Sequence, residues 1–474
     1  MTGNKLTGLI VGLAGALLFV TQPVEAHSLP RLKVSENQRY LVTVDNQPFF
    51  YLADTAWELF HRLNRAEADL YLRDRAARGF TVIQAVVIAE IDGLKTPNAY
   101  GETPFVDMDP TKPNEHYFAH VDWIVNRAAE LGLYIGMLPT WGRWAGGNDE
   151  GRNNNNFINV ENARNYGRFL GARYADKPII WILGGDRSAE KSLALWPQLA
   201  AGIRDRVGKN QLISYHPRHA SSEFYHQADW LDFNMIQSGH SPESTNFLPI
   251  EHDYALQPPK PCLDAEPAYE YPPDAIPDKR PVGAVQIRRN AYWAVFAGAF
   301  GHAYGTHPIW QMYDDGWPQK NNTKNRLPRW DVVTPWYAAL DLPGANQLRH
   351  LKQLMLSRPF VSRIPDQSIL IAPKTKNLTR IQTTRDGTPE NNDASYLMAY
   401  FPSHTEATLN TARINARNLR GWWFNPRDGS VKSLGKFRNR NEMKFTPPTD
   451  VPGEDWVLVL DDATRKYPTP GQQP

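Results

Sequence analysis

Two acidic residues, Asp186 and Glu266, each stand just beyond a short apolar run. Asp186 follows the run Ile179–Leu183 and two glycines, and Glu266 follows Pro261–Ala265 and precedes a proline. An apolar run without polar alternation is typical of a strand covered on both faces, as in parallel sheets. Both carboxyl groups are therefore expected at the carboxyl ends of buried strands. Paired carboxyl groups held there suit general acid and base chemistry.

The segments that must position these carboxyl groups alternate between strand-like and helix-like patterns over residues 40–357. Eight runs predict strands, at Pro48–Ala53, Phe80–Ile88, Leu133–Leu138, Ile179–Leu183, Gln211–Tyr215, Trp230–Ile236, Pro261–Ala265 and His302–Tyr304. Between them, segments such as Arg65–Arg78, Glu161–Tyr174, Val285–Phe300 and Trp336–Leu356 have the apolar spacing of helices. Eight strands alternating with helices predict an α/β fold of the (β/α)₈ or TIM-barrel type.

Polar and aromatic residues recur at the carboxyl ends of the predicted strands, the face at which barrels of this type form their sites. Besides the two acids, nine residues are expected to contact a substrate: Trp57, Gln84, Trp141, His216, Gln237, His240, Tyr269, His307 and Trp310. Core packing is an equal alternative for Trp57, and a structural role is open for each histidine. Asp264, Glu270 and Glu90 are alternatives to Glu266, which is preferred because it lies beyond the apolar part of its strand.

The predicted fourth and seventh strands lie nearly opposite each other in a barrel, so Asp186 and Glu266 can face each other across a sugar. Such a pair suits glycoside hydrolysis, in which one acid protonates the leaving oxygen and the other attacks the anomeric carbon or activates water. Carboxyl groups about 5–5.5 Å apart indicate retention of configuration, and about 6.5–9.5 Å indicates inversion. The chemistry needs Asp186 protonated by burial and Glu266 ionised by nearby donors. Structural ion pairing is the alternative for either acid.

Other chemistries find little support in the motifs or the composition. The sequence has no His-Glu-x-x-His and no cysteine pair, which disfavours a metal centre, and no Gly-x-Ser-x-Gly or phosphate-binding loop. Lys plus Arg (52) nearly equals Asp plus Glu (50), so a nucleic acid or membrane partner is not expected. The lone Cys262 is expected in the core. We therefore expect an enzyme without a cofactor or metal.

Both ends of the chain differ from the barrel in residue composition and hydrophobic pattern. Lys5, the apolar segment Leu6–Val20 and a small-x-Ala pattern ending at Ala26 predict a signal peptide over residues 1–26 and export to the periplasm or the medium. The barrel is assigned to residues 27–357 and a small antiparallel β-sandwich to residues 358–474. That sandwich is predicted from alternating runs at Ser368–Ile371, Ala394–Tyr400, Gly421–Asn425 and Asp455–Leu460. The Pro-rich tail from Asp461 is expected to be frayed.

Four strings together resemble the apiosidase family of glycoside hydrolases, family 140. They are Pro48–Leu59, Trp181–Asp186, Phe233–His240 and Asp264–Glu270. The resemblance spans the barrel and extends to the C-terminal module, which in this family is often labelled collagen-binding. It implies a retaining enzyme that cleaves the bond between apiose and galacturonic acid in the pectic polysaccharide rhamnogalacturonan II, with Asp186 as acid/base and Glu266 as nucleophile. Related barrels usually carry Asn-Glu at the end of strand four, where this chain has Gly185-Asp186.

The prediction is thus a secreted retaining glycosidase that acts on an oligo- or polysaccharide of the plant cell wall. The alternative is a catalytically inactive secreted protein that binds a polysaccharide or collagen. The sequence leaves open the exact linkage, endo or exo action, the role of the C-terminal domain and the oligomeric state.

Overall fold

The structure, a computed structural model, describes residues 1–2, 29–145, 156–271, 281–314, 316, 332 and 334–473. The predicted signal peptide lies outside the described residues apart from its first two positions. The Gly146-Gly147 pair and the Asn153–Asn156 run predict a long loop, which also lies outside the described residues apart from Asn156. Within the described residues, no helix has the length and apolar character needed to cross a membrane.

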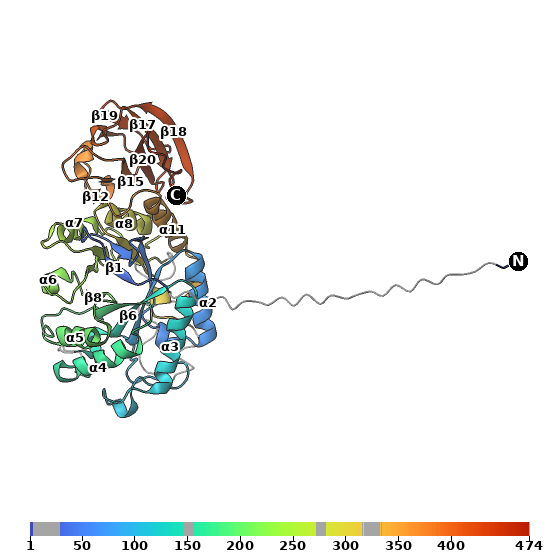
Figure 1. Ribbon diagram of the computed structural model, residues 1–474, viewed down its shortest axis with the longest axis vertical. Coiled ribbons are helices and arrows are strands. Elements are labelled where there is room, and N and C mark those ends of the chain that lie inside the picture. The colour runs from blue at the N-terminus through green and yellow to red at the C-terminus, as the bar shows by residue number, and fades with distance from the viewer. Residues whose placement is uncertain are drawn as a thin grey trace.

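Eight parallel strands form the barrel (Figure 1) and confirm the predicted α/β fold. They are β4 (Tyr51–Thr55), β5 (Val82–Ile88), β6 (Tyr134–Thr140), β7 (Ile179–Gly184), β8 (Ile213–His216), β9 (Asn234–Ile236), β10 (Cys262–Asp264) and β11 (Gly301–Tyr304). Their order is β8-β7-β6-β5-β4-β11-β10-β9. The two end strands meet where Ser214 Oγ donates a 2.6 Å hydrogen bond to the Phe233 carbonyl. Cys262 is buried, as predicted.

Helices, the longer of which cover the outside of the barrel, follow the strands. They are α1 (Leu59–Arg62), α2 (Arg65–Ala77), α3 (Glu115–Glu130), α4 (Val160–Arg173), α5 (Leu195–Val207), α6 (Ser222–Tyr225), α7 (Phe247–Ala255), α8 (Ala284–Phe296), α9 (His307–Trp310) and α11 (Pro343–Leu356). Short 3₁₀ turns are η1 (Val106–Met108), η2 (Gly142–Trp144), η4 (Ala338–Asp341), η5 (Gln367–Ile369), η6 (Asn377–Thr379) and η7 (Thr411–Arg413). Asn64 and Asn159 begin α2 and α4 with side-chain caps, which satisfy free backbone N–H groups.

Two predicted helices have different limits in the structure. The helix expected over Val285–Phe300 ends at Phe296, because Gly298 has a φ of 124° and the chain turns there into β11. The helical stretches expected within Trp336–Leu356 are η4 and α11, and Pro343 is the first residue of α11. Proline lacks a backbone N–H and fits the first turn of a helix better than its interior.

A small antiparallel sheet precedes the barrel. It contains β1 (Leu32–Val34), β2 (Leu41–Thr43) and β3 (Pro48–Phe49) in that order. The prediction of one continuous strand over Pro48–Ala53 was wrong, because the chain leaves this sheet after Phe49 and enters the barrel at Tyr51.

The C-terminal region contains two antiparallel sheets, as predicted. The larger has the order β12-β14-β15-β20-β17-β18 and the smaller β13-β16-β19. Their strands are β12 (Arg363–Pro365), β13 (Leu370–Ala372), β14 (Gln382–Asp386), β15 (Tyr396–Phe401), β16 (Ala407–Asn410), β17 (Asn418–Phe424), β18 (Val431–Arg438), β19 (Glu442–Phe445) and β20 (Trp456–Asp462). In Figure 1 these strands lie beyond α8 and α11, at one end of the molecule.

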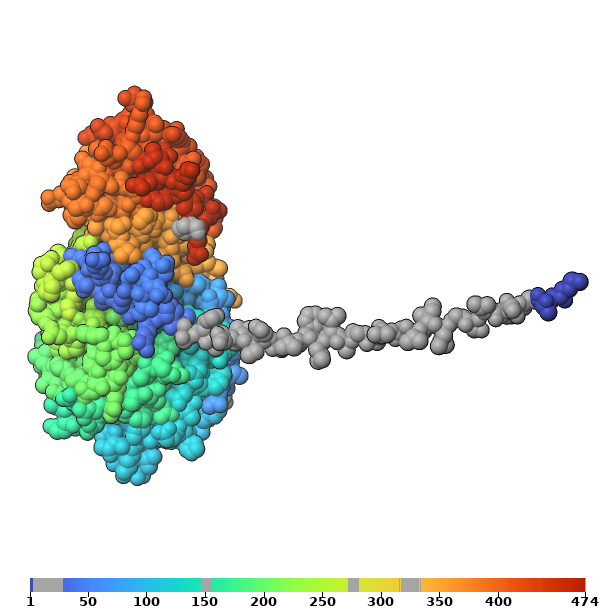
Figure 2. All heavy atoms as spheres, viewed as in Figure 1, coloured from blue at the N-terminus to red at the C-terminus, as the bar shows by residue number. Residues whose placement is uncertain are grey.

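The middle of the larger sheet is covered on both faces, because alternate residues of β15 and β20 point to opposite sides. Tyr396, Met398 and Tyr400 belong to the same apolar core as the barrel, whereas Leu397 and Phe401 belong to a second core between the two sheets. The space-filling view shows the C-terminal region seated directly on the barrel (Figure 2). The sandwich and the barrel therefore share a continuous buried interface.

Polar contacts join α8 to the larger sheet at this interface. The Arg288 guanidinium contacts Asp455, with Nη2 2.8 Å from Oδ1, and both side chains are buried. The rings of Tyr292 and Tyr400 stack with centroids 5.0 Å apart. These pairs fix the side of the barrel against which the sheet packs.

The expectation of a frayed tail from Asp461 was wrong. Asp461 lies within β20, and the chain beyond it folds back on the sheet. Tyr467 OH lies 2.6 Å from Ser395 Oγ, and the Arg358 guanidinium lies 5.1 Å from the Tyr467 ring centroid. Proline content predicted disorder, but these contacts provide enough packing to order the segment.

Candidate active site

Asp186 is carried by a turn of unusual backbone conformation directly after β7. Gly184, Gly185 and Asp186 have φ values of 90°, 125° and 52°. A Cβ on Gly184 would lie 2.4 Å from the His216 carbonyl oxygen, and one on Gly185 would lie 2.7 Å from the Trp141 ring. Only glycine fits both positions, and aspartate is one of the few other residues that adopts positive φ readily. The backbone itself therefore directs the Asp186 carboxyl group.

Glu266 lies just beyond β10 between two imidazole rings. His216 Nε2 is 2.9 Å from Oε2 and His240 Nε2 is 3.1 Å from Oε1. The other ring nitrogen of His240 lies 3.1 Å from the Pro267 carbonyl oxygen. Both nitrogens of His240 thus face oxygen acceptors, an arrangement that the protonated ring satisfies because each nitrogen then carries a proton.

The two carboxyl groups have opposite electrostatic environments. Burial alone would raise the pKa of Glu266, but the contacts and charges of His216 and His240 hold it well below its ordinary value. Burial, and next the charge of Glu266, raise the pKa of Asp186. A 2.9 Å hydrogen bond from Gln237 Nε2 to Asp186 Oδ1 offsets only part of that rise. Of the two carboxyl groups, Asp186 therefore keeps its proton to higher pH than Glu266.

Both acids line one cavity of about 150 Å³ at the carboxyl ends of the strands. Its lining residues are Trp57, Glu90, Trp141, Asp186, Gln237, His240, Glu266, Tyr269, His307 and Trp310. The walls are largely aromatic, with the Trp57 and Trp141 ring centroids 5.2 Å apart and those of His240 and Tyr269 4.2 Å apart. Aromatic walls with a few convergent polar groups are typical of small-ligand sites.

Gln84 and His216 are the two predicted site residues that do not line this cavity. His216 lies beneath it, where its ring meets Trp57 edge-on at 5.3 Å between centroids. Gln84 is buried in the middle of β5, and its amide is 3.3 Å from both Thr55 Oγ1 and the Ala265 carbonyl oxygen. Residues in mid-strand fill a barrel's interior, whereas those beyond the strand ends reach the site.

The alternative acids have different surroundings. Asp264 points to Asn246, whose amide nitrogen lies 2.7 Å from Oδ2, and burial raises its pKa to about 6. Glu270 accepts hydrogen bonds from the Gly344 N–H at 2.9 Å and Tyr304 OH at 2.8 Å, and so caps the start of α11. Glu90 remains as a third carboxyl group on the cavity wall.

A buried ionic cluster behind the site was not predicted from the sequence. Glu58 Oε2 lies 2.7 Å from His61 Nδ1, and Oε1 accepts a 2.8 Å hydrogen bond from the Ile91 N–H. Arg62 Nη1 donates a 2.5 Å hydrogen bond to the Gln311 carbonyl. The cluster thus fixes the segments next to Glu90 and Trp310. Glu58, His61 and Arg62 have the i, i+3, i+4 spacing of one helix face. Many surface helices have the same spacing, so the pattern does not distinguish a buried cluster.

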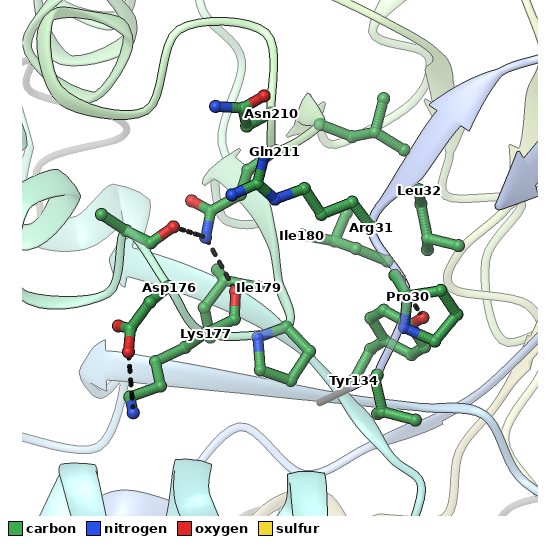
Figure 3. Close-up of a pocket in the computed structure, with 14 residues that line it drawn as sticks. Pro30, Arg31, Leu32, Tyr134, Asp176, Lys177, Ile179, Ile180, Asn210 and Gln211 are labelled. Atoms are coloured by element: carbon green, nitrogen blue, oxygen red, sulfur yellow. Dashed lines mark hydrogen bonds and ion pairs between the residues drawn. The ribbon is translucent and has the colours of Figure 1, made fainter. Parts of the chain in front are cut away.

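A second hollow, of about 360 Å³, lies at the opposite end of the barrel (Figure 3). There Arg31 and Leu32 face Lys177 and Gln211, at the amino ends of the strands. It contains neither Asp186 nor Glu266, and residues at this end of such barrels generally serve stability. Within the described ranges, no three His, Cys, Asp or Glu side chains form a cluster that could hold a metal ion.

Two solved structures resemble this chain over almost the whole of both chains. One, described as a glycoside hydrolase, is 34% identical and covers 93% of this chain and 98% of its own, with a TM-score of 0.81. The other, a glycoside hydrolase family 5 protein from Bacteroides vulgatus ATCC 8482, is 31% identical and covers 94% and 96%, with a TM-score of 0.82. Together with the barrel and its acid pair, these similarities define a glycoside hydrolase.

The family can be stated more closely. The family model described as "Apiosidase-like, catalytic domain" matches residues 35–362, so the chain belongs to the apiosidase-like family. Residues 364–461 match the model described as "Putative collagen-binding domain of a collagenase". A search of curated proteins gives no match.

Proposed function

We propose that the protein is a retaining apiosidase that cleaves the bond between apiose and galacturonic acid in rhamnogalacturonan II. Membership of the apiosidase-like family supports the substrate class. The observation that carries the mechanism is the pair of acids in one cavity, with the pKa of Asp186 raised and that of Glu266 lowered. Opposite pKa shifts in neighbouring carboxyl groups are how such enzymes separate an acid from a nucleophile.

In the first step, the Glu266 carboxylate attacks the anomeric carbon of the sugar in the cavity. The bond from that carbon to the glycosidic oxygen breaks as Asp186 donates its proton to that oxygen. The galacturonate side departs as an alcohol, and a covalent glycosyl ester remains on Glu266. The two histidines beside Glu266 favour its ionised form and thus its reactivity before the step.

In the second step, Asp186, now ionised, removes a proton from a water molecule. The oxygen of that water attacks the anomeric carbon, and the ester bond to Glu266 breaks. Asp186 is protonated again, Glu266 is again a carboxylate, and two displacements give net retention. The protein's own side chains supply every proton transfer in this sequence, so the proposal includes no cofactor.

The remaining cavity residues would bind the sugar. Trp57, Trp141 and Trp310 offer aromatic faces for the sugar's C–H groups. Gln237, His240 and His307 offer polar atoms to its hydroxyl groups, and Glu90 offers an acceptor. Gln84 and His216 would act from beneath the cavity. Gln84 would hold the end of β10 through the Ala265 carbonyl, and His216 would hold the Glu266 carboxylate.

The test is a digest of purified rhamnogalacturonan II side chains and their fragments, with products identified by mass spectrometry and NMR. We expect cleavage at the apiose–galacturonic acid bond, and the first product should keep the anomeric configuration of the substrate. Asp186→Ala and Glu266→Ala should each remove nearly all turnover while thermal unfolding stays close to wild type. Inversion of configuration, or more than a few per cent activity in either variant, would contradict the mechanism.

The same digest separates the enzyme from the alternative of an inactive binding protein. Retention of the protein on the polysaccharide without any released product would favour that alternative. We further propose that the chain is exported, on the basis of Lys5, the apolar segment Leu6–Val20 and the cleavage pattern that ends at Ala26. Edman sequencing of the protein secreted from its natural host should begin at His27.

A further inference from the structure

The hairpin of β17 and β18 carries an excess of positive charge that the chain as a whole does not. Residues 413–440 contain eight Lys or Arg residues and a single acid, Asp428, whereas the formal net charge of the whole chain is +2. More than half of the positively charged residues in this stretch are exposed. We define the basic edge as Arg417, Arg420, Lys436, Arg438 and Arg440, all of them exposed.

The register of the two strands gathers these cations. Arg420 on β17 pairs with Lys436 on β18, and Asn418 pairs with Arg438, so Arg420, Lys436 and Arg438 share one face of the sheet. Arg417 immediately precedes β17, and its carbonyl accepts a 3.0 Å hydrogen bond from the N–H of Asn439. The five cations therefore lie together at one end of the hairpin, on the outermost strand pair of the larger sheet (Figure 1).

Asp461 and Asp462, which lie near this edge, are already bound, whereas Glu442, two residues beyond Arg440, is exposed. Asp461 pairs with Arg420 across the strands, but both of its oxygens lie 2.8 Å from Arg358 nitrogens. Asp462 accepts hydrogen bonds from the Thr464 backbone and hydroxyl. In the part of the chain that the structure describes, no residue of the basic edge forms an ion pair with an Asp or Glu. By contrast, Arg413 and Arg427 of the same stretch do, with Asp366 and Asp455.

Edge strands often carry lysines to prevent pairing with another sheet, and Lys436 on β18 fits that role. That role does not explain Arg417 and Arg440, which lie outside the paired strands, nor Arg420 on the penultimate strand β17. Arrays of one sign that lack internal partners raise the local concentration of oppositely charged ligands.

We propose that the basic edge is a binding surface for an acidic polysaccharide, a chain of uronate sugars, separate from the catalytic cavity. The choice of ligand rests on the proposed function, because the bond to be cut joins a side chain to a galacturonate backbone that bears a carboxylate on each sugar. Arginine guanidinium groups pair with carboxylates through two parallel hydrogen bonds. The C-terminal domain would thereby hold the polymer near the enzyme.

The surface suits a polymer better than a membrane. Membrane-surface binding usually combines cations with a face of apolar anchors on a helix. Here the cations lie on an extended hairpin, where Leu434 is the one large aliphatic residue of β18 that is well exposed. The Arg420 guanidinium lies 5.9 Å from the centroid of the partly buried Trp422 ring.

The test measures binding without turnover, in the full-length protein with Glu266→Gln. Affinity electrophoresis through gels that contain polygalacturonate should retard this protein, and neutral galactan should not. In that background, Lys436→Glu with Arg438→Glu should weaken binding to polygalacturonate at least tenfold and reduce its dependence on salt. The matched control, Arg206→Glu with Lys376→Glu, changes the total charge equally at distant exposed positions and should stay within twofold.

Three results would overturn the proposal. They are no retardation by polygalacturonate, equal weakening by the control pair, and binding to vesicles with anionic lipid but not to polygalacturonate. The outcome is independent of catalysis, because the same Lys436 and Arg438 changes in an otherwise wild-type protein should leave cleavage of a short apioside unaltered. Absence of cleavage with intact polymer binding would reject the proposed function and keep the basic edge.

Discussion

The carboxyl ends of β7 and β10 offer the same functional group to one cavity but hold it in different ways. At β7, three consecutive residues with positive φ aim Asp186, and Gln237 is the side chain that donates a hydrogen bond to it. At β10, two histidines contact Glu266 on both oxygens. Backbone conformation sets the position of Asp186, whereas neighbouring charges set the protonation state of Glu266. The difference shows that position and protonation state can be set by separate devices within one site.

The division fits the roles proposed for the two groups. An acid must reach the glycosidic oxygen with its proton and then return as a base, so the pKa of Asp186, raised by burial and by the charge of Glu266, suits it. A nucleophile must stay ionised until it attacks, so the histidine charges around Glu266 suit it. The following changes test this contrast.

The largest effect is expected from removing either carboxylate. Glu266→Gln should lower kcat/KM by about 10³-fold or more on every substrate, because the covalent step is lost. Asp186→Asn should lower it by about 10²–10⁴-fold on the natural linkage but much less on an aryl apioside, whose leaving group needs no proton. Steady-state kinetics on both substrates, with Asp176→Asn as an exposed control, measure the contrast. Equal losses on both substrates in the Asp186 variant would remove the distinction.

The next effect should come from the turn that directs Asp186. Gly185→Ala places a Cβ against Trp141 and imposes a strained φ, so we expect a loss of stability of about 1–3 kcal/mol and a large fall in kcat. Gly101→Ala is the matched control, because Gly101 also has positive φ, at 82°, but open space around its Cβ position. Thermal unfolding and kcat are measured together. If both alanines behave alike, contact with Trp141 has no special part in placing the acid.

A smaller effect is expected from the histidines. His216→Gln should raise the pKa of Glu266, so the acid limb of the kcat/KM profile moves to higher pH. The folded-state pKa lies below the unfolded value of about 4.3, so the ionised group stabilises the fold above that pH and the contribution is lost as pH falls. The variant should therefore lose less stability on acidification. His120→Gln, away from the cavity, should leave the acid limb in place.

The smallest effect should follow Gln237→Ala. Its hydrogen bond lowers the pKa of Asp186, so removing it raises that pKa further. Asp186 then stays protonated to higher pH, and the alkaline limb of the profile should move upward while kcat falls only a few-fold. A shift of the acid limb instead would mean that Gln237 acts on Glu266.

The barrel was predictable because its strands are buried on both faces. All seven residues of β5 and all six of β7 are buried, which gives continuous apolar runs in the sequence. Most residues of β18 are exposed, and its sequence carries no such signal. The runs predicted in the C-terminal domain overlap β13, β15, β17 and β20, and in β15 and β20 alternate residues meet two separate cores.

In the site, Asp186 and Glu266 could be located because each follows a recognisable strand. Gln84 was predicted as a site residue, but it is buried within β5 and is not among the residues that line the cavity, because the sequence does not show how far along the strand the barrel interior extends. The Glu58 cluster could not be found at all, because its meaning depends on Gln311, which is distant in the chain and adjacent in space.

The contact of α8 with the β-sandwich has a consequence for how the enzyme can be divided. A barrel cut off after residue 357 would leave Tyr292 without its stacked partner and Arg288 without Asp455, and would expose the apolar surface that shares a core with Tyr396, Met398 and Tyr400. Exposed apolar patches of this kind promote aggregation. The two domains should therefore be expressed together, and truncations or domain exchanges should preserve this interface.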